Sequence, residues 1–151
     1  MSTTTTTLAE LPSLKGQQLG VSEWFEITQQ RVNTFADATD DHQWIHVDVE
    51  RASRQSPFGG PIGHGFLSLS LFVPMWSQVL TVTDKTMVVN YGLNKVRFPA
   101  PVPVGSKVRL TATLVDVAEV KAVVREPVPQ GRTREQAVAT EAVELRFLAG
   151  G

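Results

Sequence analysis

The chain has 151 residues, with 14 basic and 15 acidic side chains, a formal net charge of −1 and no cysteine. This length is typical of one domain that can bury a core without covalent staples, and the lack of cysteine excludes disulfides, thiolate nucleophiles and cysteine-ligated zinc. The near-neutral charge lacks the positive field that nucleic-acid binding requires, so we expect no nucleic-acid partner.

The first residues of the chain, Ser2 to Thr7, form a polar run rich in threonine. The run has neither the basic nor the apolar region of a secretory signal, so we expect a cytoplasmic protein. We predict a flexible N-terminal tail over residues 1–12. A single domain over residues 13–151 should follow, because no repeat and no linker-like stretch divides the rest of the chain.

The first half of this domain predicts a strand, two short helices and a polar segment between them. The strand covers Gln18 to Ile27, which is rich in apolar and aromatic side chains. Thr28 can cap a helix over about residues 29–37. The stretch from Thr39 to Asp48 is too dense in polar groups to be ordinary core, and a second short helix is expected from Asp48 to Arg54.

A cluster of glycines and prolines over residues 55–63 indicates a loop. The chain from His64 to Leu80 is then apolar on nearly every face, which is typical of a helix that is buried or crosses a membrane. Its weakly polar centre, Phe66 to Trp76, falls well short of the ~20 residues that a span requires. We therefore predict a central buried helix and no membrane partner.

The second half is rich in β-propensity. The predicted strands cover residues 85–91, 93–98, 108–114, 120–124 and 143–147, with a polar loop at residues 127–134. The fold class predicted from these elements is α+β, in which one buried helix is wrapped by a largely antiparallel sheet.

Polar residues that can carry chemistry gather around the first helix. All three histidines, His42, His46 and His64, lie in this region together with several aspartates. A zinc site is one interpretation, because His42 and His46 have a spacing that zinc ligands use on a helix. Trp44, Ile45 and the flanking aspartates instead suggest an irregular loop without a third ligand at a fixed spacing, so we expect no metal.

The pair Asp41 and His46 favours acid–base chemistry. A carboxylate and an imidazole separated by one turn can converge on a single water molecule, the carboxylate taking a proton while the imidazole orients or donates. The alternative is a loop whose aspartates only accept backbone hydrogen bonds.

Gly63, His64 and Gly65 stand at the start of the predicted buried helix. Free amides there could stabilise a thioester oxygen as it becomes enolate-like, and glycine at position 65 would let it approach closely. The alternatives are that the glycines merely form the turn and that His64 is a structural hydrogen-bonding residue. Asn90 and Tyr91 could likewise serve only the turn at Gly92.

Two long motifs carry a resemblance to a known family. They are the stretch from Phe35 to Asp48 and the stretch from Phe58 to Leu67, and similarity continues from Asn90 to Gly105. In this order and separation they closely resemble the hydratase motif of MaoC-like dehydratases, in particular the short (R)-specific enoyl-CoA hydratases that are similar to nodulation protein N. Asp40 stands where many members have glycine, and Val73 where some short hydratases have serine.

The resemblance implies a hot-dog fold, homodimers with active sites at the subunit interface, and hydration of a trans-2-enoyl-CoA to the (R)-3-hydroxyacyl-CoA. It assigns the catalytic roles to Asp41, His46 and the amide of Gly65, and no cofactor is expected because the CoA thioester is the substrate. Residues that we assign to substrate binding are Gln43, Trp44, Gly63, His64, Asn90 and Tyr91. A hot-dog acyl-CoA thioesterase and a non-catalytic acyl-CoA-binding subunit are the alternatives.

Overall fold

The computed structural model describes the backbone of residues 1–120 and 137–150, and the side chains of residues 1–118. Most of the strand expected at residues 120–124 and the loop expected at 127–134 lie outside the described residues. The elements in chain order are β1 (Thr4–Thr6), the 3-10 helix η1 (Leu11–Leu14), β2 (Gln18–Val21), β3 (Phe25–Glu26), α1 (Gln29–Thr39), α2 (Trp44–Val47), α3 (Val49–Gln55), β4 (Ile62–Gly63), α4 (Gly65–Ser70), α5 (Phe72–Val79), β5 (Leu80–Val82), β6 (Val102–Pro103), β7 (Lys107–Val120) and β8 (Ala137–Gly150).

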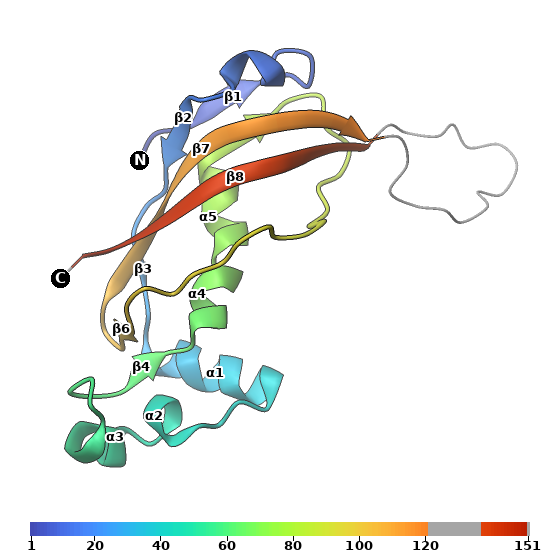
Figure 1. Cartoon of the computed structure of the whole chain (residues 1–151). Helices are drawn as coiled ribbons and strands as arrows, with labels where there is room; N and C mark the ends of the chain where they lie inside the picture. Colours follow the sequence, from blue (N-terminus) through green and yellow to red (C-terminus); the bar gives the residue numbers. More distant parts are fainter. Residues whose placement is uncertain (121–136, 151) are drawn as a thin grey trace, which may run out of the picture.

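The main sheet is antiparallel and is built around the long strand β7, to which β2, β3 and β8 all pair (Figure 1). Val108, Leu110, Ala112 and Leu114 alternate along β7 and are almost fully buried, as the period-two pattern predicts. The strand expected from Gln18 to Ile27 is divided at Ser22, whose side-chain oxygen accepts a hydrogen bond from the Leu110 amide at 2.9 Å. A side chain thus replaces a ladder bond at this point, and the strand is interrupted.

The apolar helix lies along this sheet as two pieces, α4 and α5 (Figure 1). They meet at Leu71, because Pro74 has no amide hydrogen to donate to the preceding turn. Leu67, Leu71, Met75 and Val79 recur every fourth residue and form the buried face.

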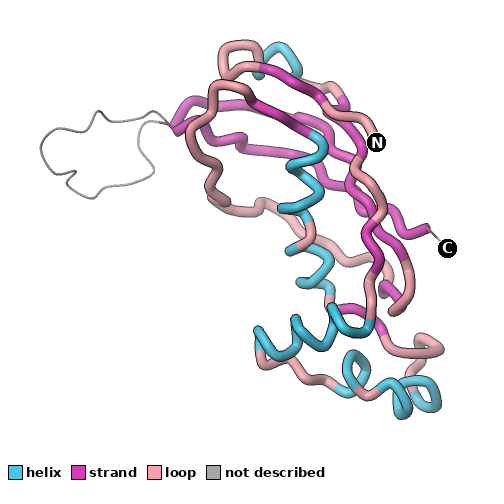
Figure 2. Tube along the Cα trace, turned by 180° about the vertical axis from the view of Figure 1, so that it is seen from behind, coloured by secondary structure: helices cyan, strands magenta, loops and turns pink. Residues whose placement is uncertain are grey.

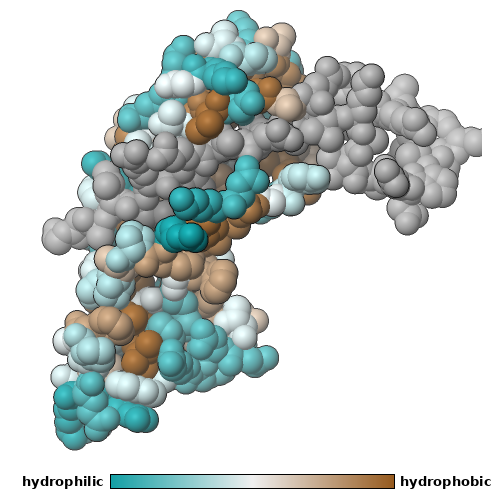
Figure 3. All heavy atoms as spheres, viewed as in Figure 1, coloured by the Kyte–Doolittle hydropathy of each residue, from teal (hydrophilic) through white to brown (hydrophobic). Residues whose placement is uncertain are grey.

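The opposite face of the same helix is exposed. Phe66 and Val73 are 67% and 54% exposed, so the prediction of a helix buried on all sides is wrong for the single chain. The space-filling view shows hydrophilic side chains at the lower end of the molecule and apolar surface in the middle of the same face (Figure 3).

The two strands predicted between residues 85 and 98 are absent. Residues 83–101, which we call the linking segment, connect β5 to β6 without joining a sheet, and Figure 2 shows them as loop. Their β-propensity is real, but no strand in the described part of the chain pairs with them. Five apolar residues of the segment are 60–75% exposed: Met87, Val88, Val89, Tyr91 and Leu93.

The first residues do not form the flexible tail that we expected. Thr4–Thr6 form β1, which pairs in parallel with Leu80–Val82. Ser2 exchanges two backbone hydrogen bonds with Val21, of 2.9 and 3.1 Å. The threonine run is polar, but its backbone finds partners on two separate elements, which a local sequence pattern cannot reveal.

The small helices α1 to α3 gather at one end of the molecule (Figure 1). Thr28 caps α1 by accepting from the Arg31 amide at 3.2 Å, and Asp48 caps α3 by accepting from the Arg51 amide at 2.9 Å. Both helices were predicted, whereas α2 replaces part of the expected irregular loop. Among the described residues, no helix combines the length and apolar character that crossing a bilayer would require.

Candidate active site

Asp41 lies where the chain leaves α1. The residue before it, Asp40, closes the helix with φ 57° and ψ 19°, in the left-handed region. Glycine adopts this conformation freely and aspartate tolerates it better than most residues, so aspartate at position 40 can make a turn that glycine would also allow. Asp41 itself is exposed and belongs to no helix or strand.

His46 is presented by α2 and is buried. Its Nδ1 lies 2.7 Å from the carbonyl oxygen of Ile62. Because a carbonyl can only accept, Nδ1 carries the hydrogen, and in the neutral imidazole Nε2 carries the free lone pair. The peptide oxygen of His46 accepts in turn from Gln29 Nε2 at 2.8 Å. The ring and backbone of His46 are therefore both fixed.

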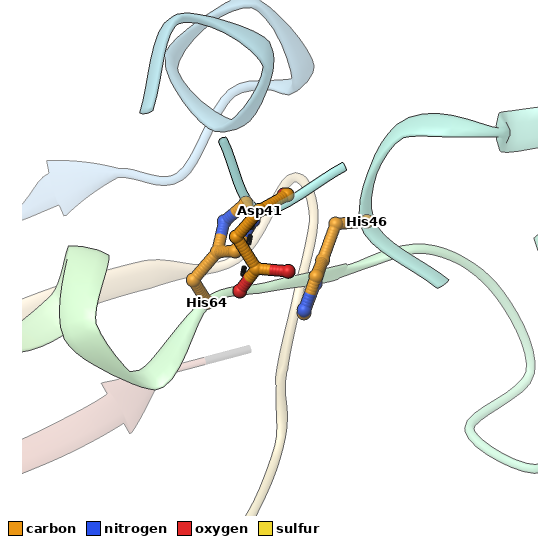
Figure 4. Close-up of side chains that lie close together, drawn as sticks. All are labelled: Asp41, His46 and His64. Atoms are coloured by element: carbon orange, nitrogen blue, oxygen red, sulfur yellow. Dashed lines mark hydrogen bonds and ion pairs between the residues drawn. The ribbon is translucent and has the colours of Figure 1, made fainter. Parts of the chain in front are cut away.

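His64 is the residue that precedes α4, and it is only 2% exposed. Its Nε2 lies 3.0 Å from the Asp41 carbonyl oxygen and 4.0 Å from Asp41 Oδ2. Its ring stacks on that of His46, with centroids 3.8 Å apart and planes at 30°. Figure 4 shows the Asp41 carboxylate close to both imidazoles.

Asp41, His46 and His64 thus form one cluster, in which each residue offers an oxygen or nitrogen within 4.8 Å of those of the other two. A partly exposed carboxylate beside an imidazole with a free lone pair can transfer protons to and from a small substrate. The same atoms are of types that bind zinc, but His64 Nε2 already donates to Asp41.

His42, the third histidine, does not belong to this cluster. It is exposed, and its Nε2 lies 2.9 Å from Asp37 Oδ1. The hydrogen bond to Asp37 raises the pKa of His42 above its usual value. The pairing of His42 with His46 that the zinc interpretation required is therefore absent.

The glycines of the predicted site lie in tight surroundings. Gly63 pairs with Val102 in the β4–β6 ladder, and a Cβ on it would lie 3.0 Å from Ile27 Cγ2. Gly65 is the first residue of α4, and a Cβ on it would lie 2.9 Å from the Phe98 ring. Neither position has room for a side chain.

The residues assigned to substrate binding are dispersed. Gln43 is the exposed N-cap residue of α2, and Trp44 packs under the Arg51 guanidinium at 4.4 Å. Asn90 and Tyr91 are exposed and lie in the linking segment. Their assignment to substrate binding stays a prediction.

Two supporting residues were not found from the sequence. Gln29 holds His46 through a backbone oxygen, and Phe98 packs against the start of α4 and against Phe66, with centroids 5.8 Å apart. A hydrogen bond to a peptide oxygen leaves no residue-type signal. The contact of Phe98 depends on a chain path that local patterns do not specify.

Comparison with known proteins gives the class. The family model described as the MaoC like domain matches residues 10–136, and the chain therefore belongs to this family. The resemblance recognised from the two motifs is confirmed.

Three relatives illustrate the likeness. The chain is 55% identical over 112 residues to 3-hydroxyacyl-thioester dehydratase Z of Mycobacterium tuberculosis, covering 74% of each chain. It is 54% identical over 103 residues to nodulation protein N of Rhizobium leguminosarum bv. viciae, covering 68% of this chain and 64% of the relative. Among solved structures, an (R)-hydratase from A. caviae involved in PHA biosynthesis has a TM-score of 0.53 and 26% identity, over 72% of this chain and 75% of that one. The predicted hot-dog fold is confirmed.

Proposed function

We propose that this chain is an (R)-specific enoyl-CoA hydratase, which adds water to a trans-2-enoyl-CoA to give the (R)-3-hydroxyacyl-CoA. The observation that carries the proposal is the convergence of Asp41, His46 and His64 beside the start of α4. The similarity to a protein named 3-hydroxyacyl-thioester dehydratase supports the substrate class, because dehydration is the same step in reverse.

In the proposed mechanism the Asp41 carboxylate takes a proton from water while the water oxygen bonds to C3 of the enoyl group. The C2–C3 double bond opens toward C2, and its electron pair takes a proton from His46. His46 can donate only as the imidazolium, in which Nδ1–H stays on the Ile62 oxygen and Nε2–H faces the reacting carbon. Return of the proton from Asp41 to His46 completes the cycle.

We assign the stabilisation of the thioester oxygen to the backbone amide of Gly65. The first amides of a helix have no acceptor within the helix, so the Gly65 N–H can meet the oxygen as negative charge develops on it. Gly65 follows His64 directly, which places this amide next to the acid–base cluster. Gly65 has no Cβ, and the Phe98 ring occupies the space that a Cβ would take.

The test is the incubation of the purified chain with crotonyl-CoA. A hydratase bleaches the absorbance of the conjugated enoyl thioester, and an (R)-specific one yields a product that only an (R)-3-hydroxyacyl-CoA dehydrogenase oxidises. Release of free CoA thiol from a saturated acyl-CoA would identify a thioesterase instead. Binding of CoA thioesters without turnover would identify a non-catalytic subunit.

We propose further that the chain acts as a homodimer. The support is the apolar surface that a single chain leaves exposed: the linking segment with Met87, Val89 and Tyr91, and the outer face of α4 and α5 with Phe66 and Val73. Exposed apolar side chains in this number are typical of an association site. A segment that joins no sheet among the described residues can also add as a strand to a second copy.

We propose one functional domain from residue 13 onward, with an acyl-CoA as the substrate and no cofactor. The cytoplasmic location stays a prediction.

A further inference from the structure

His64 is a buried titratable residue, but the proposed mechanism includes no proton transfer to or from it. It is 2% exposed, packs between Phe35 and His46, and has ring centroids 5.1 Å and 3.8 Å from theirs. The only polar contact of its ring among the described residues is with Asp41. The ring is therefore held between apolar and aromatic neighbours, with Asp41 as the polar group that it can act on.

The hydrogen-bond partners decide which ring nitrogen of His64 carries the hydrogen. Nε2 faces the Asp41 carbonyl oxygen at 3.0 Å, and this oxygen can only accept. Nδ1 is buried and has no hydrogen-bond partner among the described residues. A hydrogen on Nδ1 would leave a buried donor unpaired and would also remove the bond to Asp41, so the Nε2–H form is favoured.

The stacked partner has the opposite arrangement. His46 holds its hydrogen on Nδ1, against the Ile62 oxygen. In their neutral forms the two rings would therefore carry hydrogen on different nitrogens, with a lone pair at Nε2 of His46 and a donor at Nε2 of His64.

We infer that His64 is a positioning residue, whose Nε2–H holds the Asp41 backbone so that the carboxylate faces His46. Asp41 lies on a stretch without secondary structure, and its side chain is 55% exposed, so the loop itself does little to fix it. Displacement of a catalytic carboxylate by about 1 Å can lower the reaction rate roughly 100-fold. The inference rests on the proposed hydratase function and adds the reason why Asp41 stays in place.

The kinetic test compares two substitutions of one residue. His64→Leu fills the space but has no donor, and His64→Gln restores an amide N–H near the position of Nε2. We expect kcat for crotonyl-CoA to fall roughly 10- to 100-fold in His64→Leu with KM within about threefold, and to recover in His64→Gln to within about threefold of the unchanged chain. His42→Leu, at the exposed histidine of the same loop, is the matched control and should leave both constants unchanged.

Three kinetic results would overturn the inference. Full activity in His64→Leu would mean that Asp41 needs no anchor. A raised KM with unchanged kcat would mean that His64 binds substrate, as the sequence suggested. Equal losses in both variants would show that the ring, rather than its donor, matters.

A second measurement needs no variant and no substrate. Nitrogen NMR of the unchanged, ¹⁵N-histidine-labelled chain should show hydrogen on Nε2 of His64 and on Nδ1 of His46, and a His64 ring without hydrogen on Nε2 would refute the inference. If the unchanged chain does not hydrate crotonyl-CoA, the proposed function fails, whereas the arrangement of His64 still stands or falls on this measurement.

Discussion

The Asp41 cluster and the linking segment are both irregular stretches of backbone, but they are supported in different ways. The first is surrounded by its own chain: Asp41 by His64, His46 by Gln29 and by the Ile62 oxygen. The second, residues 83–101, presents apolar side chains to solvent without strand pairing. Irregular backbone is held by polar contacts within the chain in one region, whereas in the other we propose that a second copy of the chain covers it.

The largest loss of activity should come from removing the carboxylate of Asp41. Asp41→Asn keeps the shape and the backbone bond to His64 but removes the base, so hydration of crotonyl-CoA should fall by about 10²- to 10⁴-fold. The rate of absorbance loss measures it, with an unchanged Tm as the control for folding. Wild-type activity in both Asp41→Asn and His46→Gln would remove these residues from the mechanism.

Crowding the start of α4 should have the next largest effect. Gly65→Ala places a Cβ 2.9 Å from the Phe98 ring, and overpacking of this kind costs about 1–3 kcal/mol. The Tm of thermal unfolding and the rate of hydration should both fall.

Gly60→Ala is the matched control, because a Cβ there has no heavy atom within 4 Å. The double substitution Gly65→Ala with Phe98→Ala should regain part of the thermal stability. An unchanged Tm in Gly65→Ala would show that Phe98 does not lie against the helix in solution.

Charge in the linking segment should break the proposed dimer. Val89→Glu buries a carboxylate if a second copy covers this surface, so the dissociation constant should rise at least about tenfold, or ~1.4 kcal/mol. Sedimentation equilibrium measures it. Val49→Glu, on the exposed part of α3, should leave the association unchanged. A monomer in the unchanged chain, or a dimer indifferent to Val89→Glu, would contradict the proposal.

The smallest effect is a change in thermal stability that depends on His42, which follows Asp41 in the chain. Its pKa in the folded chain is raised by Asp37, so its contribution to stability is complete below about pH 6.5 and is lost as the pH rises through the folded pKa. His42→Gln should therefore lower Tm slightly near pH 5.5 and leave it unchanged near pH 8.5. A difference that does not depend on pH would exclude this origin.

The same contrast explains what could be predicted from the sequence. The helix cap at Thr28, the alternation along β7 and the pair Asp41 and His46 are local signals, and they identified α1, the buried face of β7 and two residues of the cluster. The strands expected in the linking segment were wrong because strand formation depends on a pairing partner as well as on β-propensity. The contact of His64 with Asp41 runs through a peptide oxygen, which every residue type offers.

The amino-terminal residues can pack against β2 only because residue 20 is a glycine. A Cβ at this position would lie 2.1 Å from the Ser2 carbonyl oxygen and 3.2 Å from that of Val79. The backbone of Ser2 thus lies where a side chain of residue 20 would be. Any side chain at this position would displace the amino-terminal residues from the sheet and make them accessible to proteases. A substitution inside the sheet would then first be detected as cleavage near the amino terminus.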